Sequence, residues 1–170
     1  LIASDKQHTM PYTAPVDFNA RVAALPSLSI AREDVGTIQR LITGGKTPVR
    51  MRLEISNKLG PQFEATNVVG EIVGRERAEE LVVLGAHLDS NDLGPGALDN
   101  AAGVAALMET ARAILALGAP PRRTLRFVLF TGEEQGMIGA TAYVARHRAE
   151  MGRTIAALIL DVGAGRPVGW

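Results

Sequence analysis

The sequence is 170 residues long, 46% hydrophobic and 21% charged, which is typical of a globular domain and not of a disordered chain. Its 18 Lys and Arg balance its 18 Asp and Glu, so no overall field favours nucleic acid or an anionic membrane as a partner. It has no cysteine, which excludes disulfides and thiolate metal sites, and its apolar stretches are too short to span a membrane. Any metal ion must be held by histidine and carboxylates.

The N-terminal third contains short predicted elements joined by loops. We expect the end of a strand at residues 1–4, a Pro-rich connector over 5–27 and a short strand over 27–30. Residues 32–43 carry apolar side chains at helical spacing and precede a Gly-Gly pair, which predicts a helix and its end. Apolar and charged residues alternate over 49–55, which predicts a half-exposed strand.

Strands and helices alternate in the remaining sequence. After a strand and a charged turn we expect a buried strand, a helix, a second buried strand, a second helix and a third buried strand. These elements correspond to residues 63–73, 74–80, 81–86, 100–117, 123–131, 136–150 and 154–160. This order implies right-handed crossovers and an α/β fold with a largely parallel core sheet.

Each predicted buried strand ends in side chains that can bind a metal ion, and a Gly- and Pro-rich loop adds one more before the first of these helices. In chain order these residues are His87, Asp89, Asp99, Glu133, Glu134 and Asp161. Because the carboxyl ends of parallel strands meet at one edge of a sheet, we expect these side chains to converge.

One imidazole with several carboxylates is a ligand set suited to zinc and, less selectively, to manganese or cobalt. A carboxylate that bridges two such ions, about 3.5–4 Å apart, helps to polarise a carbonyl group and to hold a hydroxide nucleophile. The adjacent Glu133 and Glu134 suggest a division of labour, with one as a ligand and the other as a general base.

Each residue also has an ordinary structural interpretation. Taken singly, His87 is most simply a hydrogen-bonded group, and two glutamates at a helix start are most simply solvated. Asp99 is then a helix N-cap and Asp161 a turn former. Four such coincidences at the strand ends of one sheet edge favour a site.

The remaining basic residues have simpler interpretations. His8 is expected at the surface, and His147 is expected as an exposed helix residue. Arg122, Arg123 and Arg126 are more simply charges at the start of a strand than a basic patch.

The motifs GAHLDS, GALDNAAGVA, FTGEEQG and LILDVG resemble those of the co-catalytic zinc exopeptidases, the family of bacterial zinc aminopeptidases and plasma glutamate carboxypeptidase. They occur in the family's order and with similar spacing. The resemblance implies a three-layer α/β fold that is incomplete at the C-terminus. In this fold a mixed, largely parallel sheet has helices on both faces. Residues 1–62 more weakly resemble the end of a protease-associated insert domain. We therefore predict an insert remnant and connector over 1–62, and the N-terminal part of a catalytic domain over 63–170.

The resemblance also implies roles for single residues. It implies that His87 and Asp161 bind a first zinc, that Asp99 bridges two zincs and that Glu134 binds the second zinc. Glu133 would then be the general base. Asp89 would orient His87 through its other ring nitrogen. The Asp99–Asn100 peptide bond is expected to be cis, as in many relatives.

The sequence departs from the family pattern in one respect. The family's last ligand is a histidine well downstream of the final acidic ligand, and no histidine follows Asp161. We therefore expect a complete ligand set for one zinc ion and an incomplete one for the second. Since the chain also lacks an initial Met, we expect it to be a fragment of a longer protein, inactive by itself if that histidine is essential.

The function implied by the resemblance is a metal-dependent exopeptidase of the aminopeptidase, dipeptidase or carboxypeptidase type. Its partners would be short peptides and two zinc ions, without nucleic acid or a membrane span. An extracellular or periplasmic location is implied, and a homodimer is one of the assemblies left open. Two alternatives remain: a single-zinc acyltransferase similar to glutaminyl cyclases, and an inactive receptor or interaction domain on the same fold.

Overall fold

The computed structural model describes residues 2–3, 28–45, 47–56, 58, 60–61, 63–91 and 94–162. The chain divides into two compact units, Leu1–Phe63 and Glu64–Trp170. The assignment of the first as an insert remnant and the second as part of a catalytic domain stays a prediction. None of the helices in the described ranges is long and apolar enough to cross a membrane.

In the part of the first unit that the structure describes, there are a two-stranded parallel sheet and one helix. Strand β1 (Ile2–Ala3) pairs with β2 (Ser29–Ile30), and helix α1 spans Arg32–Gly44. The predicted connector over 5–27, with His8, lies outside the described residues. The strand predicted over 49–55 is wrong: this segment is not in a strand and its large apolar side chains are exposed. Alternation alone does not make a strand, because backbone groups need a partner, and none pairs here within the described ranges.

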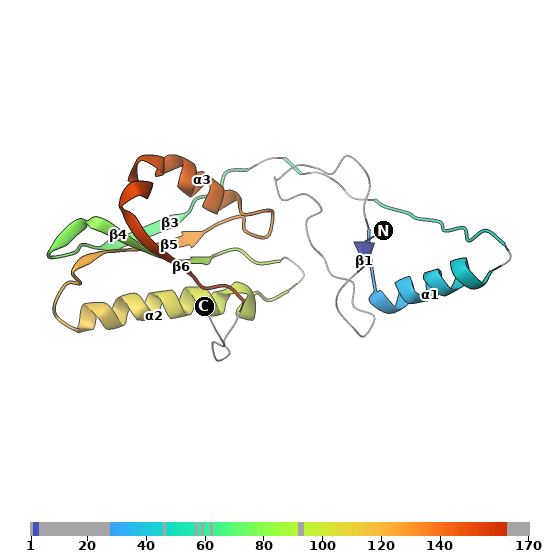
Figure 1. The fold of residues 1–170 in the computed structure, drawn as a ribbon, viewed down its shortest axis with the longest axis horizontal. Coiled ribbons are helices and arrows are strands. Elements are labelled where there is room, and N and C mark those ends of the chain that lie inside the picture. The colour runs from blue at the N-terminus through green and yellow to red at the C-terminus, as the bar shows by residue number, and fades with distance from the viewer. Residues whose placement is uncertain are drawn as a thin grey trace. The chain divides into compact units, whose positions relative to one another are not determined.

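The second unit is a mixed sheet with a helix on each face. Its described strands are β3 (Val68–Ile72), β4 (Arg77–His87), β5 (Arg123–Phe130) and β6 (Thr154–Ile159). They lie in the order β3-β5-β4-β6, with β4, β5 and β6 parallel and β3 antiparallel to β5. Figure 1 shows helix α2 (Ala102–Ala116) on one face of this sheet and α3 (Ile138–Arg146) on the other. The predicted three-layer, largely parallel α/β fold is confirmed.

Strand β4 is longer and β3 shorter than the sequence pattern predicts. The charged residues 77–80, expected in a turn, belong to β4, where Arg77 and Arg123 both contact Glu80. Strand β3 covers only the five residues that pair with β5, and Phe63 is 88% exposed. Residues 77–79 are exposed as the charge pattern suggests, but they extend β4 through an irregularity, since Arg77 pairs with Arg123 and Leu81 with Thr124 in the ladder.

Strand β6 was predicted to be buried and is not. Its side chains from Ile155 to Ile159 are exposed, although all are apolar. The reason is its position, because β6 has β4 as its neighbour on one side and no described strand on the other. The apolar pattern of a strand therefore does not by itself show that both of its faces are covered.

The boundaries of both helices of this unit differ from the predicted ones. A π-type turn (Ala97–Ala101) precedes α2, and a 3-10 helix (Arg148–Arg153) follows α3. The left-handed backbone of Gly136 and Met137 delays the start of α3 to Ile138. Of the face predicted to be apolar, Tyr143 is buried whereas Ile138, Ala142 and Ala145 are exposed.

The core between β4, β5 and α3 is formed by Val83, Val128, Phe130 and Tyr143, with the last two rings in edge-to-face contact at 5.7 Å. Beside it, Arg126 is buried rather than a strand-entry charge at the surface. Its guanidinium contacts Glu71 at 2.5 Å and Glu150 at 2.6 Å, and donates to the Tyr143 hydroxyl at 3.1 Å.

His147 is also not an exposed helix residue. Its ring packs on Tyr143, and Nδ1 lies 3.3 Å from the Arg126 guanidinium and 3.2 Å from the Glu150 carboxylate. It therefore belongs to a charged cluster that joins β3, β5, α3 and the following 3-10 helix. We call this the Arg126 cluster: Glu71, Arg126, Tyr143, His147 and Glu150.

Candidate metal centre

The carboxyl edge of the sheet brings together the residues predicted from the sequence. His87 is the last residue of β4 and only 3% exposed, and Asp161 follows β6 by two residues. Glu133 and Glu134 lie in the loop after β5, and Asp99 lies in the π-type turn before α2. Parallel pairing of β4 with β5 and β6 is what places these strand ends side by side.

The imidazole of His87 faces two carboxylates with one of its nitrogens. Nε2 lies 2.9 Å from Asp99 Oδ1 and 3.1 Å from Asp161 Oδ1. Among the described residues, two groups have ligand atoms close enough to hold a metal ion, and these three side chains form one of them. Asp99 and Asp161 come from segments 62 residues apart, so only the tertiary fold creates this group.

The other ring nitrogen determines what this arrangement can bind. Nδ1 lies 2.9 Å from the main-chain carbonyl of Asp89, which can only accept, so Nδ1 carries the ring proton. In a neutral imidazole, Nε2 then presents a lone pair to two carboxylate oxygens. Three electron-rich atoms this close need a cation among them, either a proton on Nε2 or a metal ion. One imidazole nitrogen and carboxylate oxygens are a donor set that fits zinc.

The pKa of His87 reflects the same excess of negative charge. Burial by itself lowers the pKa of the ring. The hydrogen bond to Asp99 and the negative charges of Asp161 and Glu133 act in the opposite direction and leave the pKa above its usual value.

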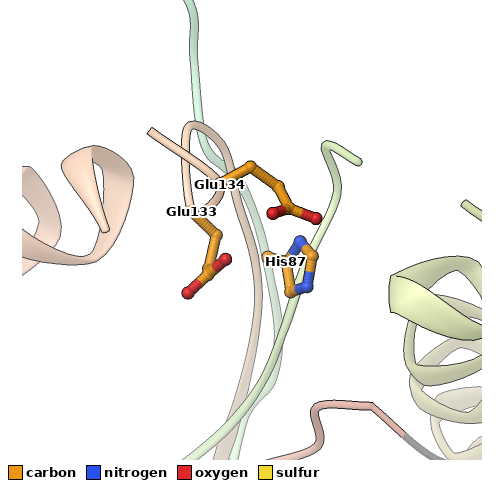
Figure 2. A group of neighbouring side chains, drawn as sticks. All are labelled: His87, Glu133 and Glu134. Carbon is orange, nitrogen blue, oxygen red and sulfur yellow. The ribbon is translucent and has the colours of Figure 1, made fainter. Parts of the chain in front are cut away.

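The second group consists of His87, Glu133 and Glu134. Figure 2 shows Glu134 extending over the imidazole and Glu133 beside it, both from the loop after β5. Burial raises the pKa of both glutamates. The nearby carboxylates Asp161 and Asp99 raise the pKa of Glu133 and Glu134 respectively, because a second negative charge is unfavourable there.

Asp89 holds the loop that carries the two glutamates. Its Oδ1 accepts the main-chain N–H of Glu133 at 3.0 Å and its Oδ2 accepts that of Glu134 at 3.1 Å. Its carboxylate is 3.7 Å from His87 Nδ1, farther than its own main-chain carbonyl. Asp89 therefore contacts both the histidine and the glutamate loop, through different atoms.

Asn100 has a structural role in this site that the sequence reasoning missed. It is 1% exposed, its Nδ2 donates to the Leu160 carbonyl at 2.8 Å, and its Oδ1 accepts the N–H of Gly103 at 3.1 Å. This joins the first turn of α2 to the end of β6 beside Asp161. The helix-start interpretation thus applies to Asn100 and leaves the Asp99 carboxylate to face His87. The sequence signal for this role was an Asp-Asn pair at a predicted helix start, where either residue can accept a main-chain N–H of the first turn.

The peptide bond between Asp99 and Asn100 is cis, as expected. All six predicted site residues lie at this edge, whereas His147 lies in the Arg126 cluster and His8 is outside the described ranges. The individual roles of the six as ligands or base stay predictions.

Comparisons with known proteins agree with this fold. The sequence profile of peptidase family M28 matches residues 67–168. Carboxypeptidase Q of Mus musculus is 36% identical over 159 residues, covering 94% of this chain and 34% of the relative. Leucine aminopeptidase 2 of Trichophyton equinum is 33% identical over 120 residues, covering 71% of this chain and 23% of the relative.

Solved structures show the same relationship. A peptidase M28 precursor from Shewanella amazonensis SB2B has a TM-score of 0.68 at 33% identity, covering 84% of this chain and 33% of that one. An aminopeptidase from Aneurinibacillus sp. strain AM-1 has a TM-score of 0.51 at 34% identity, covering 56% of this chain and 24% of that one. This chain spans about a third of the length of the curated carboxypeptidase Q relatives. The match to the profile over most of the second unit shows that the chain belongs to peptidase family M28.

Proposed function

We propose that the complete protein is a metal-dependent exopeptidase that hydrolyses peptide bonds of short peptides with a water molecule activated at a two-zinc site. The observation that carries this proposal is the geometry of His87, whose Nε2 faces two carboxylates while Nδ1 is held by a carbonyl. The relatives named carboxypeptidase Q and leucine aminopeptidase 2 support an exopeptidase class.

The described residues would hold zinc in the following way. His87 and Asp161 would bind the first ion, Asp99 would bridge, and Glu134 would bind the second. The second ion would need one further ligand besides Asp99 and Glu134. When bound, zinc supplies a Lewis acid that polarises the scissile carbonyl and lowers the pKa of water to about 7.

Glu133 would act as the general base. Its carboxylate lies in the His87–Glu134 group without being needed by the first set of ligands. Burial and neighbouring carboxylates raise its pKa, which favours acceptance of a proton from water. It would then return this proton to the leaving amine. Asp89 keeps Glu133 and Glu134 in place through their main-chain N–H groups.

Metal analysis together with a peptide assay tests this proposal. We expect the complete protein to contain zinc, to release terminal residues from short unblocked peptides, to lose this activity with a chelator and to regain it with zinc. Cyclisation of an N-terminal glutamine without hydrolysis would replace the proposal with an acyltransferase. Absence of stoichiometric zinc would replace it with an inactive interaction domain. By the same resemblance, we propose an extracellular or periplasmic location.

A further inference from the structure

The loop that carries Glu133 and Glu134 has closely joined ends. At its stem, the N–H of Gly139 donates to the Thr131 carbonyl at 2.8 Å, and the N–H of Ile138 donates to the Gly132 carbonyl at 2.9 Å. Within it, Gly136 and Met137 donate to the Glu133 carbonyl. The backbone direction at the two glutamates therefore depends on how this stem is held.

Asn67 lies against the stem from another part of the chain. Just before β3, it donates from Nδ2 to the Gly139 carbonyl at 2.8 Å and accepts the Thr131 N–H on Oδ1 at 3.0 Å. A side-chain amide offers one donor and one acceptor side by side, which is what these two main-chain groups require. Asp would keep the acceptor but lose the donor.

The stem leaves no room for a side chain at Gly139. A Cβ on Gly139 would lie 2.2 Å from the Thr131 carbonyl oxygen and 2.4 Å from Asn67 Oδ1. The two ends of the loop and the asparagine amide are therefore in close contact. Because there is no free space between these groups for even one added carbon atom, movement of one of them would shift the others.

We propose that Asn67 is a positioning residue for the glutamate loop, acting together with Asp89. Asp89 holds the loop at the N–H groups of Glu133 and Glu134, and Asn67 holds its two ends. Asn67 thereby determines the position from which the Glu133 carboxylate would accept a proton from water and the position from which Glu134 would bind the second cation. The effect on catalysis rests on the proposed function, whereas the effect on the loop does not.

The test compares Asn67→Ala with a matched control, Thr124→Ala, in the complete protein. Thr124 is also a buried side chain that joins main-chain groups, accepting the Gly74 N–H at 3.1 Å and donating to the Ala78 carbonyl at 2.7 Å. It lies at the start of β5, whereas Thr131 follows the end of the same strand. Both variants remove one accepted and one donated hydrogen bond, but only Asn67→Ala affects the glutamate loop.

We expect amide exchange to become faster over residues 131–139 in Asn67→Ala and near Gly74 in Thr124→Ala. In zinc-loaded protein, kcat should fall by about 10- to 100-fold in Asn67→Ala with KM changed by less than about threefold, because a small misplacement of catalytic groups affects the transition state most. Thr124→Ala should leave kcat within about twofold of wild type, since it is remote from the reacting groups.

Unchanged exchange over residues 131–139, or a kcat loss no larger than that of Thr124→Ala, would overturn the proposal. Asn67→Asp serves if Asn67→Ala does not fold. In this variant the Thr131 N–H should stay protected while exchange becomes faster at the Gly139 end, and kcat should fall below that of wild type and of Thr124→Ala. Full wild-type kcat and exchange would contradict the proposed role. If wild-type protein with bound zinc does not cleave peptides, the proposed function fails, while the exchange measurement still decides the placement of the loop.

Discussion

The second unit gathers carboxylates around a buried basic side chain in two places, with different results. In the Arg126 cluster, Glu71 and Glu150 both pair with a guanidinium that is always charged and has five donors. At the carboxyl edge, five carboxylates surround the single imidazole of His87. The first cluster contains a permanent cation that donates to both of its carboxylates. The second has an excess of acceptors and one nitrogen lone pair that faces them.

The pKa directions express this difference. Burial alone lowers the pKa of Arg126, but its hydrogen bonds to Tyr143, Glu71 and Glu150 outweigh burial and raise it. The hydrogen bond to Arg126 lowers the pKa of Glu150, whereas burial raises the pKa of Glu133 and Glu134. Glu133 and Glu134 thus resist ionisation at a site that needs a cation. Glu150 ionises more readily because its cluster already contains the cation Arg126.

The largest effect should come from removal of the shared carboxylate. Asp99→Ala should lose both zinc ions and all detectable peptidase activity, because Asp99 faces His87 Nε2 in the first group and is the proposed bridge. Metal analysis of the purified complete protein measures this loss. Retention of two zinc ions per chain would show that Asp99 does not bridge.

Glu133→Gln should separate chemistry from metal binding. We expect kcat to fall by about 10²- to 10⁴-fold, the usual contribution of a general base, while zinc content stays at the wild-type level. Steady-state kinetics and metal analysis on one sample provide the comparison. Loss of zinc in this variant would instead make Glu133 a ligand.

Arg126→Met should affect stability and leave zinc in place. Breaking a buried ion pair costs about 3–5 kcal/mol, and we expect a value near the lower end because Glu71 and Glu150 are partly exposed. The matched control is Arg112→Met, which breaks an exposed pair with Glu109 and should cost less than about 1 kcal/mol. Denaturant unfolding measures both; equal costs, or loss of zinc from Arg126→Met alone, would contradict the comparison.

The smallest effect should be the pH dependence that Glu150 contributes. The hydrogen bonds from Arg126 and His147 lower its folded-state pKa below the usual 4.5. Its stabilisation is therefore present above the unfolded pKa and is lost as the pH falls from there through the lower folded pKa. Glu150→Gln should lose less stability than wild type between pH 6 and pH 3, as measured by denaturant midpoints. Parallel losses in the two proteins would show that Glu150 does not contribute.

Local sequence patterns predicted the order of elements in the second unit and the polar side chains that lie together at its carboxyl edge. Apolar runs predicted β4 and β5, and the polar side chains after them predicted a metal site, because parallel strands end at a common edge. The helix periodicity of 32–43 likewise predicted α1 within a residue. The pattern failed at 49–55 and at β6, since pairing and burial depend on neighbours that local alternation does not specify.

The tertiary structure decided which atoms face one another. Nothing local in the sequence indicates that the Asp89 carbonyl fixes the His87 proton, that Asn100 connects α2 to the end of β6, or that Asn67 holds the glutamate loop. These contacts join residues whose separation ranges from 2 to 72 positions, and they depend on the sheet order β3-β5-β4-β6. The sequence by itself determined the chemical types of the candidate ligands, because those depend only on the identity of single residues. Their geometry was decided only by folding, because hydrogen-bond direction depends on the positions of distant backbone groups.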